Sequence, residues 1–188
     1  MRIISGKHKG HRFYPPKKLP YRPTTDISKS GLFNILSNWW NFDNLKIIDL
    51  FSGTGAITYE FSSRGCEDIT SIDLHAGCVA FLKKSAASLN MKGINALKGD
   101  VFAFLKKYKD GPADLIFASP PYAINDDIYR IAEYTFERED ILAKHGWLVI
   151  ETSHLLELDS YPYFVFKRSY GGTIFNFFMW EPIEELKD

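Results

Sequence analysis

The chain has 188 residues, of which 45% are hydrophobic and 15% aromatic. This length suits one domain with at most a small appendage, and the apolar content excludes global disorder. The chain lacks an apolar run of about 18 residues and begins with a polar, basic segment, so we expect neither a membrane span nor a secretory signal. Cys66 and Cys78 form no C-x-x-C pattern and the histidines lack ligand spacing, which favours a cytoplasmic protein without a metal.

The charges are unevenly distributed although the net charge is zero. Residues 1–30 contain eight Lys or Arg and one Asp, a net charge of +7, and the remaining residues contain 15 basic and 22 acidic groups, a net charge of −7. A basic segment on an acidic body is typical of a surface that contacts phosphates. The alternative is a solvated segment without a partner.

The N-terminal part predicts a hairpin followed by a connector. In residues 2–14, two apolar pairs flank a polar turn with two glycines, which is a hairpin pattern. Three prolines between residues 15 and 20 favour an extended connector. A helix is then expected to begin at Asp26, capped by Thr24 or Thr25. We therefore expect a basic hairpin and connector over residues 1–25 and a main domain over residues 26–188.

Strands and helices alternate from Lys46 onward, which indicates a mainly parallel sheet. The expected strands are 46–50, 69–73, 94–98, 113–118 and 146–151, and the expected helices are 56–64, 76–90, 100–107 and 126–136. The tail predicts a β-hairpin over residues 164–180 with a turn at Gly171-Gly172. The expected fold class is therefore α/β: a Rossmann-like, mainly parallel seven-stranded sheet with an antiparallel last strand, helices on both faces and the N-terminal hairpin as an extension.

A glycine turn follows the first of these strands, in the stretch Asp49-Leu-Phe-Ser-Gly53-Thr-Gly55. Glycine permits a positive φ and close approach of a ligand, and the next helix offers unpaired N–H groups. Asp73 ends the second strand, 18 residues past Gly55, where a fold of this kind holds a ribose diol. The incomplete G-x-G-x-x-G pattern and the missing Walker lysine weigh against nicotinamide and nucleoside triphosphate cofactors. A purely structural turn is the alternative.

Several polar residues follow strand ends and should meet at one edge of the sheet, where open α/β sheets bind ligands. They are Asp49, Asp73, Asp100 and the run Ser119-Pro120-Pro121-Tyr122. The two prolines leave carbonyl oxygens able to accept hydrogen bonds from a ligand, and Tyr122 offers a flat ring for stacking on a base. A surface loop is the alternative interpretation of this run.

The glycine turn together with Ser119-Pro-Pro-Tyr122 resembles the S-adenosylmethionine-dependent amino-methyltransferases of the Rossmann-like class I type. The opening hairpin, Arg22-Pro-Thr-Thr-Asp26 and Leu32-Phe-Asn-Ile-Leu36 narrow the resemblance to the bacterial 16S ribosomal RNA guanine-N2 methyltransferases of the RsmD type. The similarity runs over residues 2 to 180 with the motifs in the same order. It implies a monomeric enzyme that methylates the exocyclic N2 amine of a guanine, with 16S rRNA or the small ribosomal subunit as its partner.

The resemblance also implies roles for individual residues. The cofactor S-adenosyl-L-methionine would be held at its methionine end by Asp49 and the backbone around Gly53 and Gly55, at its ribose by Asp73, and at its adenine by Asp100. Phe51, Leu74 and Val101 would also contact it. The target guanine would be held by Ser119, the Pro120 carbonyl and Tyr122. The target pocket would be bordered by Arg22, Thr24, Asp26 and Pro121, and rRNA phosphates would be gripped by Arg2, Lys7, Lys9 and Arg12.

Ser119 departs from the family, which usually has an aspartate there. The residue at this position and the Pro120 carbonyl should accept the two hydrogens of the amine, which turns the nitrogen lone pair toward the methyl group. Serine accepts such a bond without an anion, so it stabilises developing positive charge less. Because serine here also resembles some DNA amino-methyltransferases, a DNA enzyme stays an alternative, as does a catalytically weak RNA-binding or ribosome-assembly protein. Orientation of the amine should be the main catalytic contribution.

Overall fold

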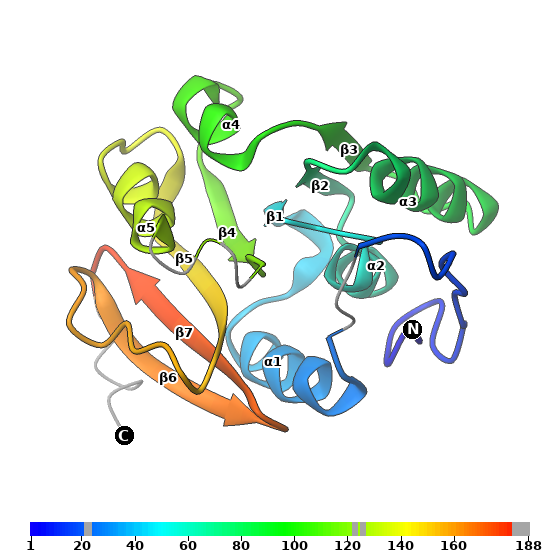
Figure 1. Ribbon diagram of the computed structural model, residues 1–188, viewed down its shortest axis with the longest axis horizontal. Helices are drawn as coiled ribbons and strands as arrows, with labels where there is room; N and C mark the ends of the chain where they lie inside the picture. The colour runs from blue at the N-terminus through cyan, green and yellow to red at the C-terminus, as the bar shows by residue number, and fades with distance from the viewer. Residues whose placement is uncertain (21–23, 122–123, 125–126, 182–188) are drawn as a thin grey trace.

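Seven strands form one mixed sheet in the computed structural model, which describes residues 1–20, 24–121, 124 and 127–181 (Figure 1). The strand order is β3-β2-β1-β4-β5-β7-β6. The strands are β1 (Lys46–Leu50), β2 (Asp68–Asp73), β3 (Ile94–Lys98), β4 (Ala113–Ala118), β5 (Leu142–Ser153), β6 (Phe164–Tyr170) and β7 (Thr173–Met179). Strands β1 to β5 pair in parallel, and β7 pairs antiparallel with both β5 and β6. The predicted fold class is confirmed.

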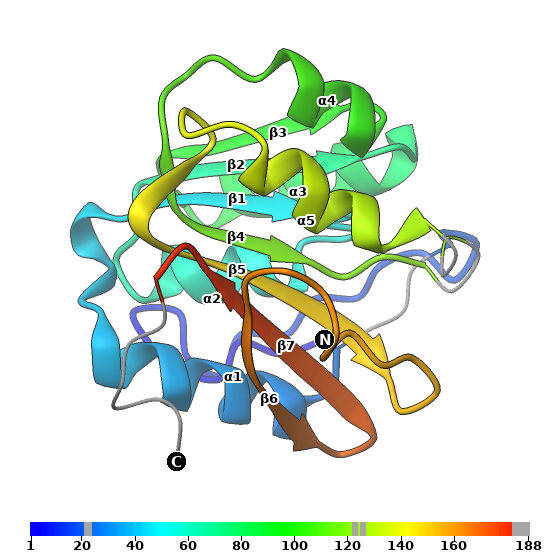
Figure 2. The same cartoon turned by 90° about the vertical axis from the view of Figure 1, so that its left-hand side faces the viewer.

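Helices cover both faces of this sheet, as Figure 2 shows from the side. The helices are α1 (Asp26–Trp39), α2 (Ala56–Ser63), α3 (Ala76–Ser88), α4 (Val101–Lys107) and α5 (Tyr129–Phe136). On one face, Ile48 and Leu50 of β1 pack with residues of α4 and α5. On the other face, Ile47 packs with residues of α1 and α2, and α3 adjoins α2. Coverage on both faces explains why β1 is almost entirely buried.

Strand β5 differs from the prediction at both ends. It begins at Leu142 instead of residue 146, because Leu142 pairs with Ala113 and a register shift in the β4–β5 ladder accommodates the extra residues. It continues to Ser153 instead of residue 151, because its last residues pair with the start of β7. Both extensions depend on partner strands that are distant in the sequence. Helix α5 begins at Tyr129, and residues 125–126 at its predicted start lie outside the described residues.

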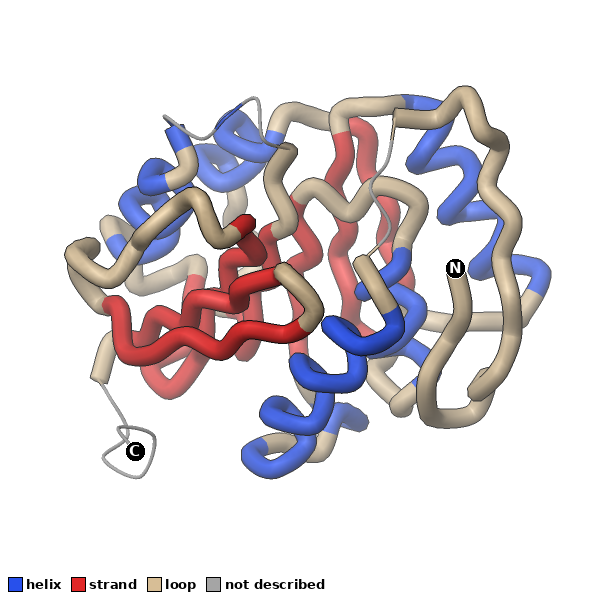
Figure 3. Tube along the Cα trace, turned by 60° about the horizontal axis from the view of Figure 1, so that its bottom comes forward, coloured by secondary structure: helices blue, strands red, loops and turns tan. Residues whose placement is uncertain are grey.

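The predicted N-terminal hairpin is a looped segment with a single antiparallel bridge, between Arg2 and Arg12 (Figure 3). Its arms are joined by backbone hydrogen bonds such as Ile3 N–H to the His11 carbonyl, and the turn docks on α2, where the Lys7 N–H donates to the Ser63 carbonyl. Gly6 (φ 82°) lies directly against this carbonyl, and a Cβ there would sit 1.8 Å from the Ser63 oxygen. The segment therefore needs a glycine to dock on α2.

A buried ion network joins the N-terminal segment to α1 and α2. Lys29 and Glu60 are 1% and 0% exposed, and the Lys29 Nζ lies 2.9 Å from the Glu60 Oε1. The same oxygen accepts a hydrogen bond of 2.8 Å from the Ile4 N–H. Lys29 also donates to the Arg2 carbonyl, and Arg64 pairs with Glu60. Ile3 and Phe13 are buried beside this network. The division at residue 25 stays a prediction, but the segment before it shares a core with α2 and α3.

Among the helices of the described residues, none combines the length and apolar character needed to cross a membrane.

Candidate active site

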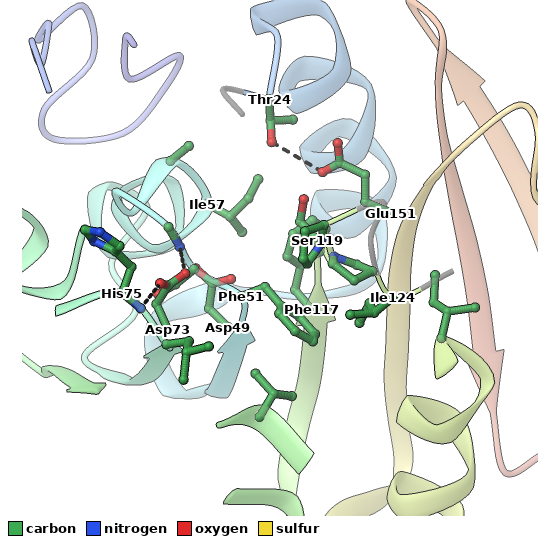
Figure 4. Close-up of a pocket in the computed structure, with 18 of the residues that line it drawn as sticks. Thr24, Asp49, Phe51, Ile57, Asp73, His75, Phe117, Ser119, Ile124 and Glu151 are labelled. Carbon is green, nitrogen blue, oxygen red and sulfur yellow. Dashed lines mark hydrogen bonds between the residues drawn. The ribbon is translucent and has the colours of Figure 1, made fainter. Parts of the chain in front are cut away.

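A cavity of about 650 Å³ opens at the carboxyl ends of the parallel strands (Figure 4). Its lining residues come from the turn after β1, from the ends of β2, β4 and β5, and from the start of α4. The cavity brings together these predicted site residues: Asp49, Phe51, Gly53, Asp73, Leu74, Asp100, Val101, Ser119, Pro120, Pro121 and Thr24. Gly55 and Asp26 are not among the lining residues.

Asp49 is a buried carboxylate at the base of the cavity. Its side chain is 1% exposed, and its Oδ2 accepts a hydrogen bond of 2.5 Å from the Thr58 hydroxyl, which also contacts Ser71. Burial, together with the smaller effect of the charges of Asp73 and Glu151, raises the pKa of Asp49 from 3.8 to about 7, against the opposing effect of the Thr58 hydrogen bonds. No basic side chain of the described residues forms an ion pair with it. The position therefore favours a cationic group of a ligand.

The glycine turn has three residues with positive φ: Phe51 (59°), Gly53 (53°) and Gly55 (93°). Gly55 is needed for packing, since a Cβ there would sit 2.9 Å from Leu82 and from Tyr59. Ser52, between Phe51 and Gly53, lines the cavity and is almost fully buried, and its hydroxyl has no hydrogen-bond partner among the described residues. A buried polar atom without a partner is unfavourable unless a ligand or water supplies one.

Asp73 lies at the end of β2 with its carboxylate fixed by two backbone donors. The Gly53 N–H donates to Oδ2 at 2.8 Å and the His75 N–H donates to Oδ1 at 2.7 Å. Leu74 beside it is 68% exposed and leaves an apolar surface at the rim. Asp100 caps α4 through a bond of 2.8 Å from the Ala103 N–H. Both aspartates thus have fixed orientations.

Ser119 follows β4 on the side of the cavity opposite Asp73, as Figure 4 shows. Its N–H donates to the Leu50 carbonyl at 3.3 Å, which continues the pairing of β4 with β1 beyond the end of the strand. Pro120, Pro121 and Ile124 continue the cavity wall from there. Tyr122, predicted to stack on the target base, lies outside the described residues, as does Arg22.

Glu151 is a charged lining residue that sequence reasoning missed. It lies on β5, is 7% exposed, and accepts a hydrogen bond of 3.3 Å from the Thr24 hydroxyl. In the sequence it reads as the last residue of a buried strand, and the prediction gave it no role. The signal was present, because a glutamate after the apolar run Trp147–Ile150 stands at a strand end like Asp49 and Ser119.

The predicted phosphate-binding residues lie away from the cavity lining, on the N-terminal segment. Lys7, Lys9 and Arg12 are exposed. Arg2 instead pairs with Asp26 at 2.9 Å, both side chains being about half exposed. Lys29, which contributes to the +7 charge of residues 1–30, belongs to the buried network and is unavailable to a partner. The surface charge of this segment is therefore smaller than its sequence implies.

Residues 1–179 match the model of the family described as conserved hypothetical protein 95. The chain belongs to this family. A ribosomal RNA small subunit methyltransferase D of Buchnera aphidicola is 33% identical over 148 residues, which cover 79% of this chain and 70% of that protein. The putative rRNA methyltransferase YlbH of Bacillus subtilis is 29% identical over 164 residues, covering 84% and 85%. A solved structure, the putative methyltransferase yhhF of Escherichia coli, has a TM-score of 0.81 at 23% identity and covers 95% of this chain and 96% of its own.

These findings confirm the predicted class: a methyltransferase that uses S-adenosylmethionine. Solved structures that share the fold include methyltransferases with S-adenosylhomocysteine bound. The cavity fits such a cofactor on three observations. Asp49 suits a cationic amino acid end, the buried Ser52 hydroxyl needs a partner, and the Asp73 carboxylate is aligned at the edge beside an exposed leucine.

Proposed function

We propose that the chain methylates the exocyclic N2 amine of a guanine in 16S rRNA, as free rRNA or within the small ribosomal subunit. The observation that carries the proposal is the combined cavity, in which acidic and glycine-turn residues at β1 and β2 face the Ser119-Pro120-Pro121 run at β4. Curated relatives named as ribosomal RNA small subunit methyltransferases support the choice of substrate.

Two groups of residues divide the cavity between cofactor and target. Asp49 would attract the ammonium end of S-adenosylmethionine, and the Asp73 carboxylate would accept from the ribose hydroxyls. Asp100, Leu74 and Val101 would surround the adenine. When bound, this cofactor supplies a methyl group carried on a positively charged sulfonium. The sequence assignments for Phe51, Gly53 and Gly55 near the methionine end are part of the same proposal.

The target side orients the amine. The Pro120 carbonyl and the Ser119 hydroxyl would each accept one hydrogen of the guanine amine, so that its lone pair turns away from conjugation with the ring. Pro120 lacks an N–H and its ring fixes φ, which keeps this carbonyl in place. When the amine is already bound in the reactive orientation, the entropy of bringing two reactants together is lost on binding and not in the chemical step. This can lower a reaction barrier by about 7–11 kcal/mol. Thr24 and Pro121 would border the base, with Arg22 and Tyr122 as further proposed contacts.

The exposed cations of the N-terminal segment would contact rRNA phosphates. Lys7, Lys9 and Arg12 lie on the looped segment, and Lys17 and Lys18 lie on the connector that leads to Pro20 and Thr24 at the cavity. Cations on the segment that precedes these cavity residues in the chain would attract a polyanion to this part of the molecule. Arg2 and Asp26 would act by holding the start of α1 against this segment. We propose that the enzyme works as a monomer.

Methyl transfer from labelled S-adenosylmethionine to three acceptors tests the proposal: unmodified small ribosomal subunits, free 16S rRNA and duplex DNA, each followed by identification of the labelled nucleoside. We expect N2-methylguanine from a ribosomal acceptor. Label only in DNA would replace the proposal with a DNA amino-methyltransferase, the function that Ser119 favours. Cofactor binding without transfer to any acceptor would favour an RNA-binding or assembly protein.

A further inference from the structure

We propose that Glu151 is the anionic acceptor for one hydrogen of the target amine, which it shares with the Ser119 hydroxyl, and that it supplies the negative charge that Ser119 lacks. The inference rests on the proposed function, because it names the group that recognises the amine in that same pocket.

The strand register places Glu151 beside Ser119. In the parallel β4–β5 ladder, Ala118 pairs with Ile150, so the next residues on the two strands, Ser119 and Glu151, lie level. Side chains that are level on neighbouring strands point to the same face, and neighbouring strands lie about 4.8 Å apart. Both residues line the cavity, and Figure 4 shows them together on the side opposite Asp73. A group that reaches the Ser119 hydroxyl is therefore close to the Glu151 carboxylate.

The environment of Glu151 is unusual for a residue that only builds the sheet. Its cross-strand partner on β7 is Phe175, which is fully buried, and the preceding residues of β5 are apolar. A carboxylate that is 7% exposed among such neighbours is costly to bury, and a group of this kind is common where a protein recognises a polar ligand. Its charge acts across the cavity, because it is among the groups that raise the pKa of Asp49.

Methylation of the amine requires a group that accepts a proton from the nitrogen. The nitrogen uses its lone pair to form the bond to the methyl carbon, and the electron pair of the old bond leaves with the sulfur of the donor. The nitrogen then carries a positive charge, and it loses one proton to a Glu151 oxygen, which passes the proton to water. A neutral secondary amine results. A carboxylate also accepts hydrogen bonds without donating any, so it favours an amine over a carbonyl edge of a base.

The competing role for Glu151 is structural: its hydrogen bond with Thr24 would hold the residues before α1 against β5. The variant Glu151→Gln separates the two roles, because its amide oxygen still accepts from Thr24 while the charge is lost. Thr24→Val does the reverse, since it removes the bond and keeps the carboxylate.

The experiment compares these variants on the acceptor that the wild-type chain labels. A lost hydrogen bond to a charged group weakens binding or the transition state by about 1.5–3 kcal/mol, so we expect Glu151→Gln to lower the transfer rate by about 10- to 100-fold. Cofactor affinity by calorimetry and the unfolding midpoint should stay near the wild-type values, and acceptor binding without cofactor should weaken several-fold. Thr24→Val should lower the rate less. Asp159→Asn, which neutralises the exposed partner of Lys167, is the matched control and should stay within about twofold.

A rescue completes the test. In the Glu151→Gln background, Ser119→Asp restores a carboxylate to the same place. The transfer rate of this double variant should be at least about tenfold higher than that of Glu151→Gln alone. The inference is overturned if Glu151→Gln stays within about twofold of an active wild type, if Thr24→Val matches its loss, or if Ser119→Asp restores nothing. A wild type that labels no ribosomal acceptor refutes the proposed function instead. In that case the same comparison on DNA, or on acceptor binding without cofactor, decides the role of Glu151.

Discussion

Two buried carboxylates, Glu60 and Asp49, have opposite surroundings. Glu60 is 0% exposed and has ionic partners in Lys29 and Arg64 and a backbone donor in Ile4. Asp49 is 1% exposed, and its hydrogen-bonding neighbour is the Thr58 hydroxyl. Burial raises the pKa of Asp49 to about 7. One carboxylate is compensated within the protein and the other faces a cavity.

This difference separates the charges that hold the fold from those that await a ligand. Removal of one partner from a buried ion pair leaves the other uncompensated and strongly destabilises a protein. A buried carboxylate without a cation can instead take up a proton, and a cationic ligand can later replace that proton. The network under the N-terminal segment should therefore govern stability, whereas Asp49 should govern cofactor affinity and its pH dependence.

The largest expected effect is on stability. Glu60→Ala leaves the buried Lys29 with only the longer, 3.6 Å contact to Asp26 and frees the Ile4 N–H, so we expect the free energy of unfolding to fall by about 3–5 kcal/mol. Urea denaturation measures it. The exposed pair Lys167–Asp159 is the control, where Asp159→Asn should change stability by about 0–1 kcal/mol. Equal effects at the two pairs would show that the buried network has no special role.

The second prediction concerns cofactor affinity. Asp49→Asn removes the charge that would face the ammonium group, so S-adenosylmethionine should bind about 10- to 100-fold more weakly by calorimetry, as expected for loss of a charged hydrogen bond. The free energy of unfolding at pH 8 should stay equal or increase, because a buried charge has been removed. Full affinity in this variant, or a large loss of stability, would place Asp49 with Glu60 as a structural residue.

The third prediction concerns how the free energy of unfolding depends on pH through the ionisation of Asp49. Its pKa is about 7 in the folded chain and 3.8 for an aspartate in water, as in the unfolded chain, so the folded state binds the proton more tightly. Its contribution to stability is complete below about pH 4 and is lost as the pH rises through 7. The free energy of unfolding of the wild type, relative to Asp49→Asn, should therefore decrease from pH 5 to pH 8. A difference that is constant over this range contradicts the raised pKa. Cofactor affinity should rise over the same range, because the anion is the binding form.

The smallest effect is expected at the exposed cations. Lys7→Ala with Lys9→Ala should leave the unfolding midpoint unchanged, in contrast to the buried Lys29. Acceptor binding should weaken. In a plot of the logarithm of the acceptor association constant against the logarithm of salt concentration, the slope should become less steep by about 0.7–0.9 for each lost phosphate contact. Lys167→Ala with Arg168→Ala, two exposed cations on β6, is the charge-matched control. An unchanged salt dependence would remove these lysines from the proposed RNA surface.

Local sequence signals accounted for most of the fold and for part of the site. Thr25 was one of two predicted caps and does cap α1, accepting from the Ser28 N–H at 3.1 Å. The strand ends carrying Asp49, Asp73 and Ser119 were predictable because apolar runs, turn glycines and prolines are read within a few residues. The convergence of these ends follows from parallel topology alone.

Pairings between distant segments were decided by the tertiary structure. Lys29 counted as a surface charge in the sequence, but helix packing buries it against Glu60, 31 residues away. Glu151 read as the end of a buried strand, and its place beside Ser119 depends on the β4–β5 register. The sequence by itself determined the order of the elements and the chemical types at the strand ends, because these depend on neighbouring residues. Which charges are paired inside and which face the cavity was decided only by folding, because charge compensation depends on distances between elements.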